Sequence, residues 1–268
     1  AARMEHCAMT DFHDYLESLI LGNHHELAKL RADERESFVF PTAKPQWAPS
    51  RHYDIAHLKM DWEMDIEQER VDAISTLRIR SRDSALMRLR LHAAELDIRS
   101  VQDSEGRELE WEMRPDEQEM LVYLDSSLSE GEEEDITFVY VIDHPRAGLY
   151  FTNPCPEFPD IESSAWTQMQ DDMARFVVPI YDNPSHKFSF EAIITVPEGY
   201  FAMSNGTLKN RQKNENGTEM FHWVQELPIP AYLMTVATSE YIAYKEDLDG
   251  LEVSYYAHKK WDRETVYR

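Results

Sequence analysis

The feature that most constrains the fold is a nine-residue run, 58–66, in which apolar and charged side chains alternate strictly. A period of two places all the apolar side chains on one face of an extended strand and the charged ones on the other. Similar alternation recurs at 87–91, 136–142, 188–196 and 232–236. The sequence therefore predicts an all-β fold, a sandwich or a large twisted sheet. The side chains expected in its core include Leu58, Met60, Trp62, Phe188, Phe190 and Ile194.

Composition narrows the class of protein further. The chain has 268 residues and a formal net charge of −24, which argues against nucleic acid or an anionic membrane surface as its main partner. Hydrophobic residues make up 42% of the chain, which is enough to bury a core. The sequence contains no run of eighteen apolar residues, so it predicts no membrane-spanning helix. The two cysteines, Cys7 and Cys155, are expected to be free thiols, which favours a reducing, cytoplasmic location.

The first fifty residues differ from the rest. Phe12, Leu16 and Leu19 fall at helical spacing within residues 10–32, and prolines at 41, 45 and 49 end regular structure. Residues 1–50 are therefore predicted to be a short helical extension followed by a linker. The first ten residues contain no apolar segment of the kind found in secretory signals, although a signal that has been removed leaves no trace.

Glycine is scarce and lies where turns are expected. Asn205-Gly206, Asn216-Gly217 and Asp249-Gly250 are dipeptides typical of β-hairpins. A threonine follows each Asn-Gly pair, so Asn205 and Asn216 also match the glycosylation sequon. We favour the turn interpretation because the turn itself requires Asn-Gly.

The segment 101–135 carries fourteen acidic residues against two basic ones. We interpret it as a solvated outer face, because the run at 132–135 lacks the alternating spacing and the glycine of a calcium loop. The histidines do not show the spacing of a zinc site: His24-His25-Glu26 has no second histidine four residues away. Nucleophile elbows, phosphate loops and dinucleotide fingerprints are also missing from the sequence.

An ordered series of motifs in residues 148–206 carries the most information. They are Gly148-Leu149-Tyr150-Phe151, Trp166-Thr167-Gln168-Met169-Gln170, Arg175-Phe176-Val177-Val178-Pro179-Ile180-Tyr181-Asp182-Asn183-Pro184, Thr195-Val196-Pro197 and Ser204-Asn205-Gly206. This series resembles the amino-terminal domain of the aminopeptidase N family of zinc metallopeptidases. The resemblance covers residues 51–257 and implies a saddle-shaped β domain, with 258–268 as the start of a connection to a catalytic domain.

Three positions depart from the family pattern. Ile180 replaces the usual cysteine, and Val177-Val178 replace an aromatic pair; both changes are expected to lie in the core. Met169 stands where glycine or cysteine is common, and its larger side chain is expected to narrow a pocket beside the substrate-facing residues.

The resemblance implies that Gln168 and Gln170 contact substrate. The position of Gln170 helps to hold the free α-amine of a peptide, and that of Gln168 lines the side-chain pocket; alternatively, both amides satisfy backbone groups at a strand edge. The family's Gly-x-Met-Glu-Asn loop and His-Glu-x-x-His helix do not occur in this chain. The chain is therefore expected to hold no cofactor and to have no catalytic residues, with zinc bound in a separate catalytic domain.

The leading hypothesis is thus a non-catalytic, substrate-contacting domain of a zinc aminopeptidase that removes amino-terminal residues from peptides. One alternative is a protein-interaction module of the same fold, like a subunit of the transcription factor that contains the TATA-binding protein. Another is a stand-alone β-sandwich that binds carbohydrate or protein.

Overall fold

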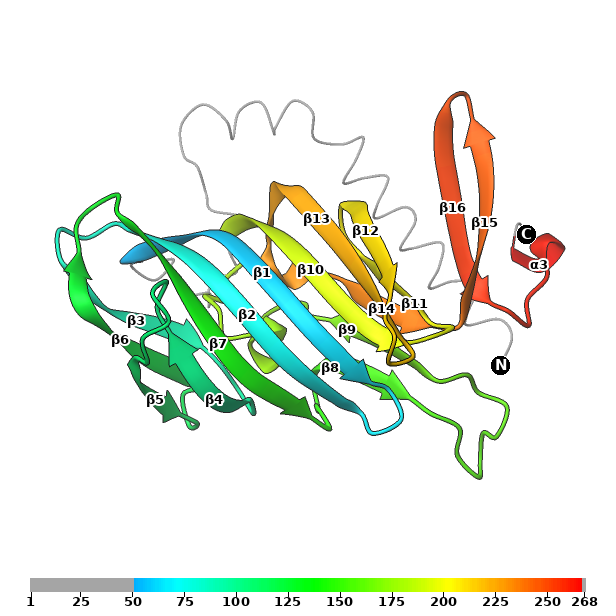
Figure 1. The fold of residues 1–268 in the computed structure, drawn as a ribbon, viewed down its shortest axis with the longest axis horizontal. Helices are drawn as coiled ribbons and strands as arrows, with labels where there is room; N and C mark the ends of the chain where they lie inside the picture. Colours follow the sequence, from blue (N-terminus) through cyan, green and yellow to red (C-terminus); the bar gives the residue numbers. More distant parts are fainter. Residues whose placement is uncertain (1–50, 267–268) are drawn as a thin grey trace, which may run out of the picture. The chain divides into compact units, whose positions relative to one another are not determined.

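The computed structural model describes residues 51–266, which belong to a compact unit that begins at Pro49 (Figure 1). The helix expected within residues 10–32, together with Cys7 and the His24-His25 pair, lies outside the described residues. Strands dominate the described part, as the alternating pattern predicts. The all-β prediction is therefore confirmed.

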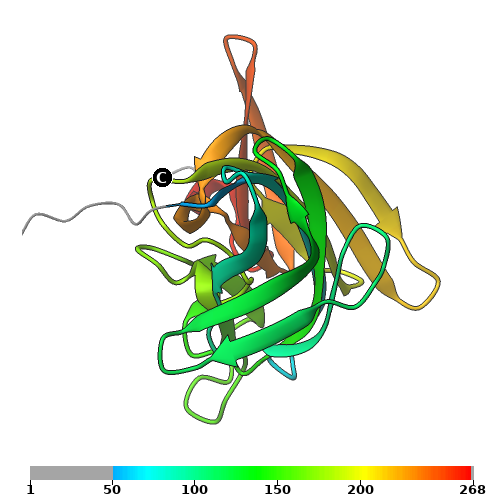
Figure 2. The same ribbon diagram turned by 90° about the vertical axis from the view of Figure 1, so that its left-hand side faces the viewer.

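A seven-stranded sheet forms the largest element, in the order β12-β13-β10-β1-β2-β7-β4. Its strands are β1 (Tyr53–Asp65), β2 (Arg70–Ser81), β4 (Asp97–Gln102), β7 (Glu133–Asp143), β10 (Lys187–Pro197), β12 (Thr207–Lys213) and β13 (Thr218–Pro230). Strands β1 and β10 are parallel, whereas their other neighbours in the sheet run antiparallel. Figure 2 looks at the sheet from the end that carries β4 and shows its strong twist.

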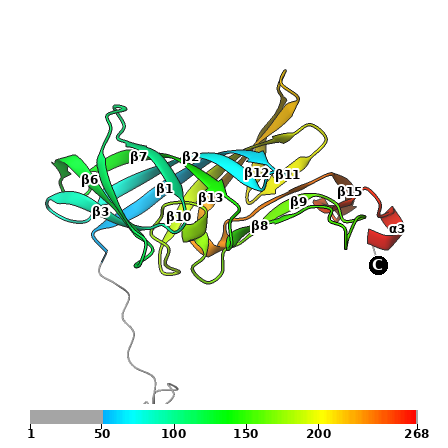
Figure 3. The same ribbon diagram turned by 90° about the horizontal axis from the view of Figure 1, so that it is seen from below.

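Two smaller sheets lie toward opposite ends of the large one (Figures 1 and 3). The three-stranded sheet has the order β3-β6-β5 and the four-stranded sheet the order β11-β14-β9-β8. Their strands are β3 (Leu86–His92), β5 (Glu110–Arg114), β6 (Glu119–Leu128), β8 (Gly148–Thr152), β9 (Ser164–Gln168), β11 (Phe201–Ser204) and β14 (Val236–Ser239).

The remaining elements are short or peripheral. They are the hairpin of β15 (Tyr241–Leu248) and β16 (Leu251–His258), the 3₁₀ turns η1 (Ala174–Phe176) and η2 (Ala231–Leu233), and the helix α3 (Arg263–Val266). The hairpin projects from the body of the fold (Figure 1).

One continuous core lies between the large sheet and the two small ones. The six side chains predicted to be buried are all 0–1% exposed, including Trp62 on β1 and Phe190 on β10. Leu89 and Met120 of the three-stranded sheet and Ala165 of the four-stranded sheet join the same cluster. Each small sheet therefore buries one face against the large sheet, as sandwiched layers require.

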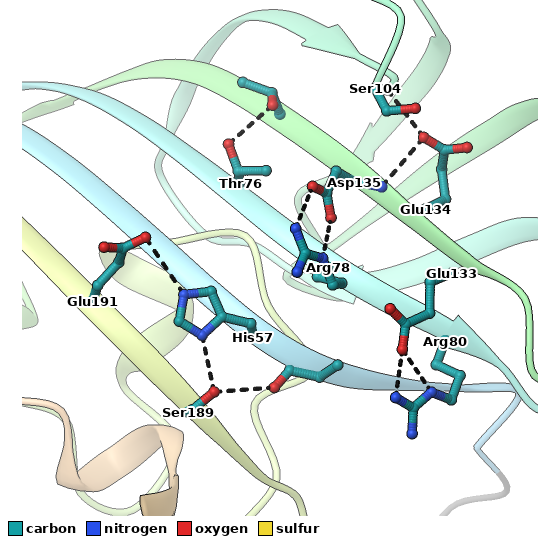
Figure 4. A network of polar contacts seen from close by, with 12 residues as sticks. His57, Thr76, Arg78, Arg80, Ser104, Glu133, Glu134, Asp135, Ser189 and Glu191 are labelled. Atoms are coloured by element: carbon teal, nitrogen blue, oxygen red, sulfur yellow. Dashed lines mark hydrogen bonds and ion pairs between the residues drawn. The ribbon is translucent and has the colours of Figure 1, made fainter. Parts of the chain in front are cut away.

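The opposite face of the large sheet is polar (Figure 4). Carboxylates of the acidic 101–135 segment pair there with arginines of the neighbouring strand β2: Arg78 binds Asp135 at 2.8 Å, and Arg80 pairs with Glu133. Across the parallel strands, the Nδ1 of His57 lies 2.9 Å from the Oγ of Ser189. The end of the acidic segment, residues 133–135 on β7, thus forms part of an exposed sheet surface whose charge is partly neutralised by cross-strand ion pairs.

Two local expectations are wrong. Met87 was expected on the buried face of its strand with Leu89 and Leu91, but it is 48% exposed. The pairing of β3 with β6 shifts register between Leu86 and Arg88, and Leu86 is buried instead while Met87 and Arg88 are both exposed. The Asn205-Gly206 turn joins β11 of one sheet to β12 of another and is not a hairpin; the other two dipeptides do connect antiparallel strand pairs.

Candidate functional site

Strand β9, labelled in Figure 3, carries the candidate site on the face whose side chains are exposed. Ala165 and Thr167 point into the fold and are buried, whereas Trp166 is 41% exposed and Gln168 is also exposed. The alternation continues past the end of the strand, where Met169 is 1% exposed and Gln170 is exposed. Trp166 and Gln168 therefore lie on the same face of β9, and Gln170 is exposed in the turn that follows the strand.

The amides of both glutamines are available to a ligand. Within residues 51–266, neither side chain makes a hydrogen bond to another part of the protein, and so neither satisfies a backbone group at the strand edge. An amide carries two donors and an acceptor oxygen, which can accept from an ammonium group. The alternative role for Gln168 and Gln170 therefore finds no support in these contacts.

Met169 does not narrow a surface pocket, contrary to expectation. Its side chain is 1% exposed and belongs to the hydrophobic core, whereas the residues on either side of it, Gln168 and Gln170, are exposed. Val177, Val178 and Ile180 are each 0% exposed, as expected for core substitutions.

An apolar row borders the glutamines, and the sequence analysis missed it. The rings of Tyr150 on β8 and Trp166 on β9 are stacked, with centroids 6.0 Å apart and an interplanar angle of 24°. The strand register continues the row through Ala237 to Met203. Only the cross-strand pairing of four separate segments reveals this row. A ligand held at Gln168 would therefore meet an aromatic surface one pleat away.

Buried polar contacts hold the candidate strand in place. Thr167 accepts a 2.9 Å hydrogen bond at its Oγ1 from the backbone nitrogen of Val236 on β14. The loop after Gln170 turns through η1, and the carboxylate of Asp182 accepts from the backbone nitrogen and the Nε of Arg175 at 3.1 and 3.3 Å. Burial raises the pKa of Asp182 to about 6, although the Arg175 contacts favour its ionised form. The glutamines therefore extend from a well-anchored segment.

The described residues offer no metal centre. Between residues 51 and 266, no group of three or more His, Cys, Asp or Glu side chains is arranged to hold a metal ion. As for membrane-spanning segments, the same range contains no helix that is long and apolar enough to cross a membrane. Cys155 is a free thiol.

Comparison with known proteins identifies the family. The sequence profile of the peptidase M1 N-terminal domain matches residues 49–233, from just before β1 to the end of η2. This chain belongs to the M1 peptidase family. The matched part of the M1 domain includes β9 and both glutamines. The resemblance to the amino-terminal domain of zinc aminopeptidases is thereby confirmed.

Several curated M1 relatives are similar over most of this chain. It is 21% identical over 196 residues to leukotriene A-4 hydrolase of Xenopus laevis, covering 71% of this chain and 32% of that protein. It is also 21% identical over 219 residues to leucine aminopeptidase 2 of Vanderwaltozyma polyspora, covering 76% and 33%. The chain thus spans about a third of the length of these relatives.

Solved structures show the same M1 fold. The M1 zinc metallopeptidase of Deinococcus radiodurans matches with a TM-score of 0.63 at 19% identity, over 77% of this chain and 47% of that one. A mutant of that enzyme bound to a Tyr-Ser-Ala substrate matches with a TM-score of 0.62 at 20% identity, with the same coverage.

Proposed function

We propose that this chain is the substrate-contacting, non-catalytic domain of a zinc aminopeptidase that removes amino-terminal residues from peptides. The observation that carries the proposal is the pair of exposed amides within the matched M1 domain, Gln168 at the end of β9 and Gln170 in the turn that follows. The curated relatives named leucine aminopeptidase and the substrate-bound M1 structure support the same reaction class.

In this proposal the two glutamines have different tasks. The Oε1 of Gln170 accepts a hydrogen bond from the α-ammonium of the peptide, and Gln168 lines the space for the first side chain. Zinc is held by another domain of the same protein, where it polarises the scissile carbonyl and activates water. In this proposal, residues 51–257 bind the substrate. Residues 1–50 precede them as an extension, and a connection to the catalytic domain begins at residue 258.

The test is a comparison of substrates with and without a free amine, in the full-length protein that contains this chain. A hydrogen bond to a charged group contributes about 1.5–3 kcal/mol, so Gln170→Ala should lower kcat/KM for the free peptide by roughly ten- to a hundredfold. Gln170→Glu should retain or strengthen amine binding because a carboxylate adds a charge-assisted bond. Gln212→Ala, an exposed glutamine on β12, is the matched control and should leave kcat/KM unchanged.

The acetylated substrate decides between the possible outcomes. If Gln170→Ala lowers turnover of free and acetylated peptides by the same factor, Gln170 does not contact the amine. If the full-length protein hydrolyses no aminoacyl reporter substrate at all, the interaction-module alternative replaces the peptidase proposal.

A further inference from the structure

A cavity with basic walls lies between the start of β1 and the strands β3 and β6. Its volume is about 260 Å³, and its lining includes Arg51, Arg88, Arg90, His92, Glu119 and Tyr181. Three guanidinium groups around one cavity are unexpected in a chain with a net charge of −24.

Strand β3 brings two of the arginines together. Leu89 and Leu91 are 0% exposed and face the core, so the alternating Arg88 and Arg90 project from the opposite face of the strand. The strand thus presents both guanidinium groups on the side that lines the cavity.

The charges of the cavity do not balance. Arg90 is ion-paired with Glu119, and the Nε of Arg51 lies 2.7 Å from Asp54. Arg88 is exposed and has no carboxylate partner among residues 51–266. Arg88 is therefore the guanidinium group of the lining that no carboxylate of the described residues neutralises.

The inner wall of the cavity is rigid and aromatic. The hydroxyl of Tyr53 donates a 2.8 Å hydrogen bond to the backbone oxygen of Arg90, and its ring meets that of Tyr181 edge-on at 6.4 Å. His92 accepts at its Nδ1 from the backbone nitrogen of Asp182 at 3.0 Å, so the neutral ring carries its hydrogen on Nε2. Burial, followed by the charge of Arg175, lowers the pKa of His92 and keeps it neutral near pH 7.

We propose that this cavity binds a single oxyanion group of a small molecule, a phosphate or a carboxylate, with Arg88 as its principal ligand. The planar fork of a guanidinium matches the paired oxygens of either group. Tyrosine and histidine side chains line the space around that group, and the cavity is smaller than a typical drug-sized site. The proposal stands apart from the peptidase function because none of its residues belongs to the glutamine-bearing face.

The experiment titrates the 268-residue chain with inorganic phosphate and, separately, with acetate at constant ionic strength, following the arginine Nε–Hε signals by NMR. At least one of the anions should give a saturable shift of the Arg88 signal, and the tighter one identifies the source of the oxyanion. Arg88→Gln should weaken the affinity, read from the Arg90 signal, by about tenfold or more. Arg99→Gln, which removes an exposed guanidinium on β4, is the matched control and should change the affinity less than twofold.

A second variant is expected to raise the anion affinity, so the test does not depend only on variants that lower it. Glu119→Gln removes the one carboxylate in the lining and should raise the anion affinity by about threefold or more. Shifts that rise linearly without saturation for both anions, or equal losses in Arg88→Gln and Arg99→Gln, would show general screening of surface charge and overturn the proposal.

Discussion

Asp182 accepts two hydrogen bonds from Arg175, one from the backbone nitrogen and one from Nε, and its carboxylate is almost completely enclosed. The backbone nitrogen of Asp182 donates in turn to His92 on β3. The Arg175 carbonyl accepts a 2.9 Å hydrogen bond from Ala94, just after the same strand. Hydrogen bonds therefore connect the loop that follows Gln170 to the three-stranded sheet, in addition to its covalent continuity with β9.

Removing the Asp182 carboxylate should destabilise the fold strongly. Asp182→Ala leaves the Arg175 guanidinium, whose side chain is only 12% exposed, without its buried partner, and we expect a loss of about 3–5 kcal/mol in the free energy of unfolding. Urea denaturation at pH 7 measures it. Asp172→Ala, which removes an exposed partner of the same arginine, should cost less than about 1 kcal/mol. Equal losses in the two variants would mean that burial of the pair does not matter.

Two glycines in matched turns should respond differently to alanine. Gly206 and Gly217 both have positive φ, +85° and +78°, so each substitution costs about 1 kcal/mol of backbone strain. At Gly206 the new Cβ would also lie 2.0 Å from the backbone oxygen of Val224, whereas at Gly217 it would meet nothing within 4 Å. Thermal unfolding should therefore show a clearly larger drop in Tm for Gly206→Ala. Similar drops would contradict the close approach of this turn to the backbone of β13.

The imidazole of His186 should make stability depend on pH. Burial, followed by the charge of Arg51, lowers its pKa to about 4, and its Nε2 accepts a 2.8 Å hydrogen bond from the backbone nitrogen of Ile55. Because the folded protein binds this proton less readily than the unfolded chain, the contribution of His186 is complete above about pH 6.5 and falls as the pH drops toward 4. We expect the stability advantage of the wild type over His186→Gln to shrink by about 2 kcal/mol across that range.

Urea denaturation at several pH values between 4 and 7.5 measures this difference. His144→Gln, at an exposed position, corrects for the loss of one imidazole. An advantage over His186→Gln that stays constant across the range would contradict a neutral, buried His186.

Alanine substitutions at two neighbouring positions, 168 and 169, should have very different effects on the free energy of unfolding. Met169→Ala removes a buried side chain and should lower the free energy of unfolding by about 2–4 kcal/mol. Gln168→Ala, one residue earlier on the exposed face, should change it by less than about 0.5 kcal/mol. Denaturation of the two variants in parallel checks the alternation that places the glutamines outward. A large loss for Gln168→Ala would assign that side chain a structural role.

The sequence by itself determined the fold class and the inward-facing set of residues on β1 and β10. Alternation is a local property: a period of two assigns Trp62 and Phe190 to one face wherever their strands lie. The ordered motifs from Gly148 to Gly206 likewise identified the family before any geometry was known.

Tertiary structure alone decided how these strands combine. The parallel pairing of β1 with β10 joins segments more than a hundred residues apart, and the bulge that exposes Met87 arises where β3 meets β6. Tyr150 and Trp166 stack because β8 pairs with β9, and Arg88 and Tyr181 line one cavity although they are far apart in the sequence. Such contacts depend on packing between distant parts of the chain, where register and layer order are set by mutual burial and not by local preference.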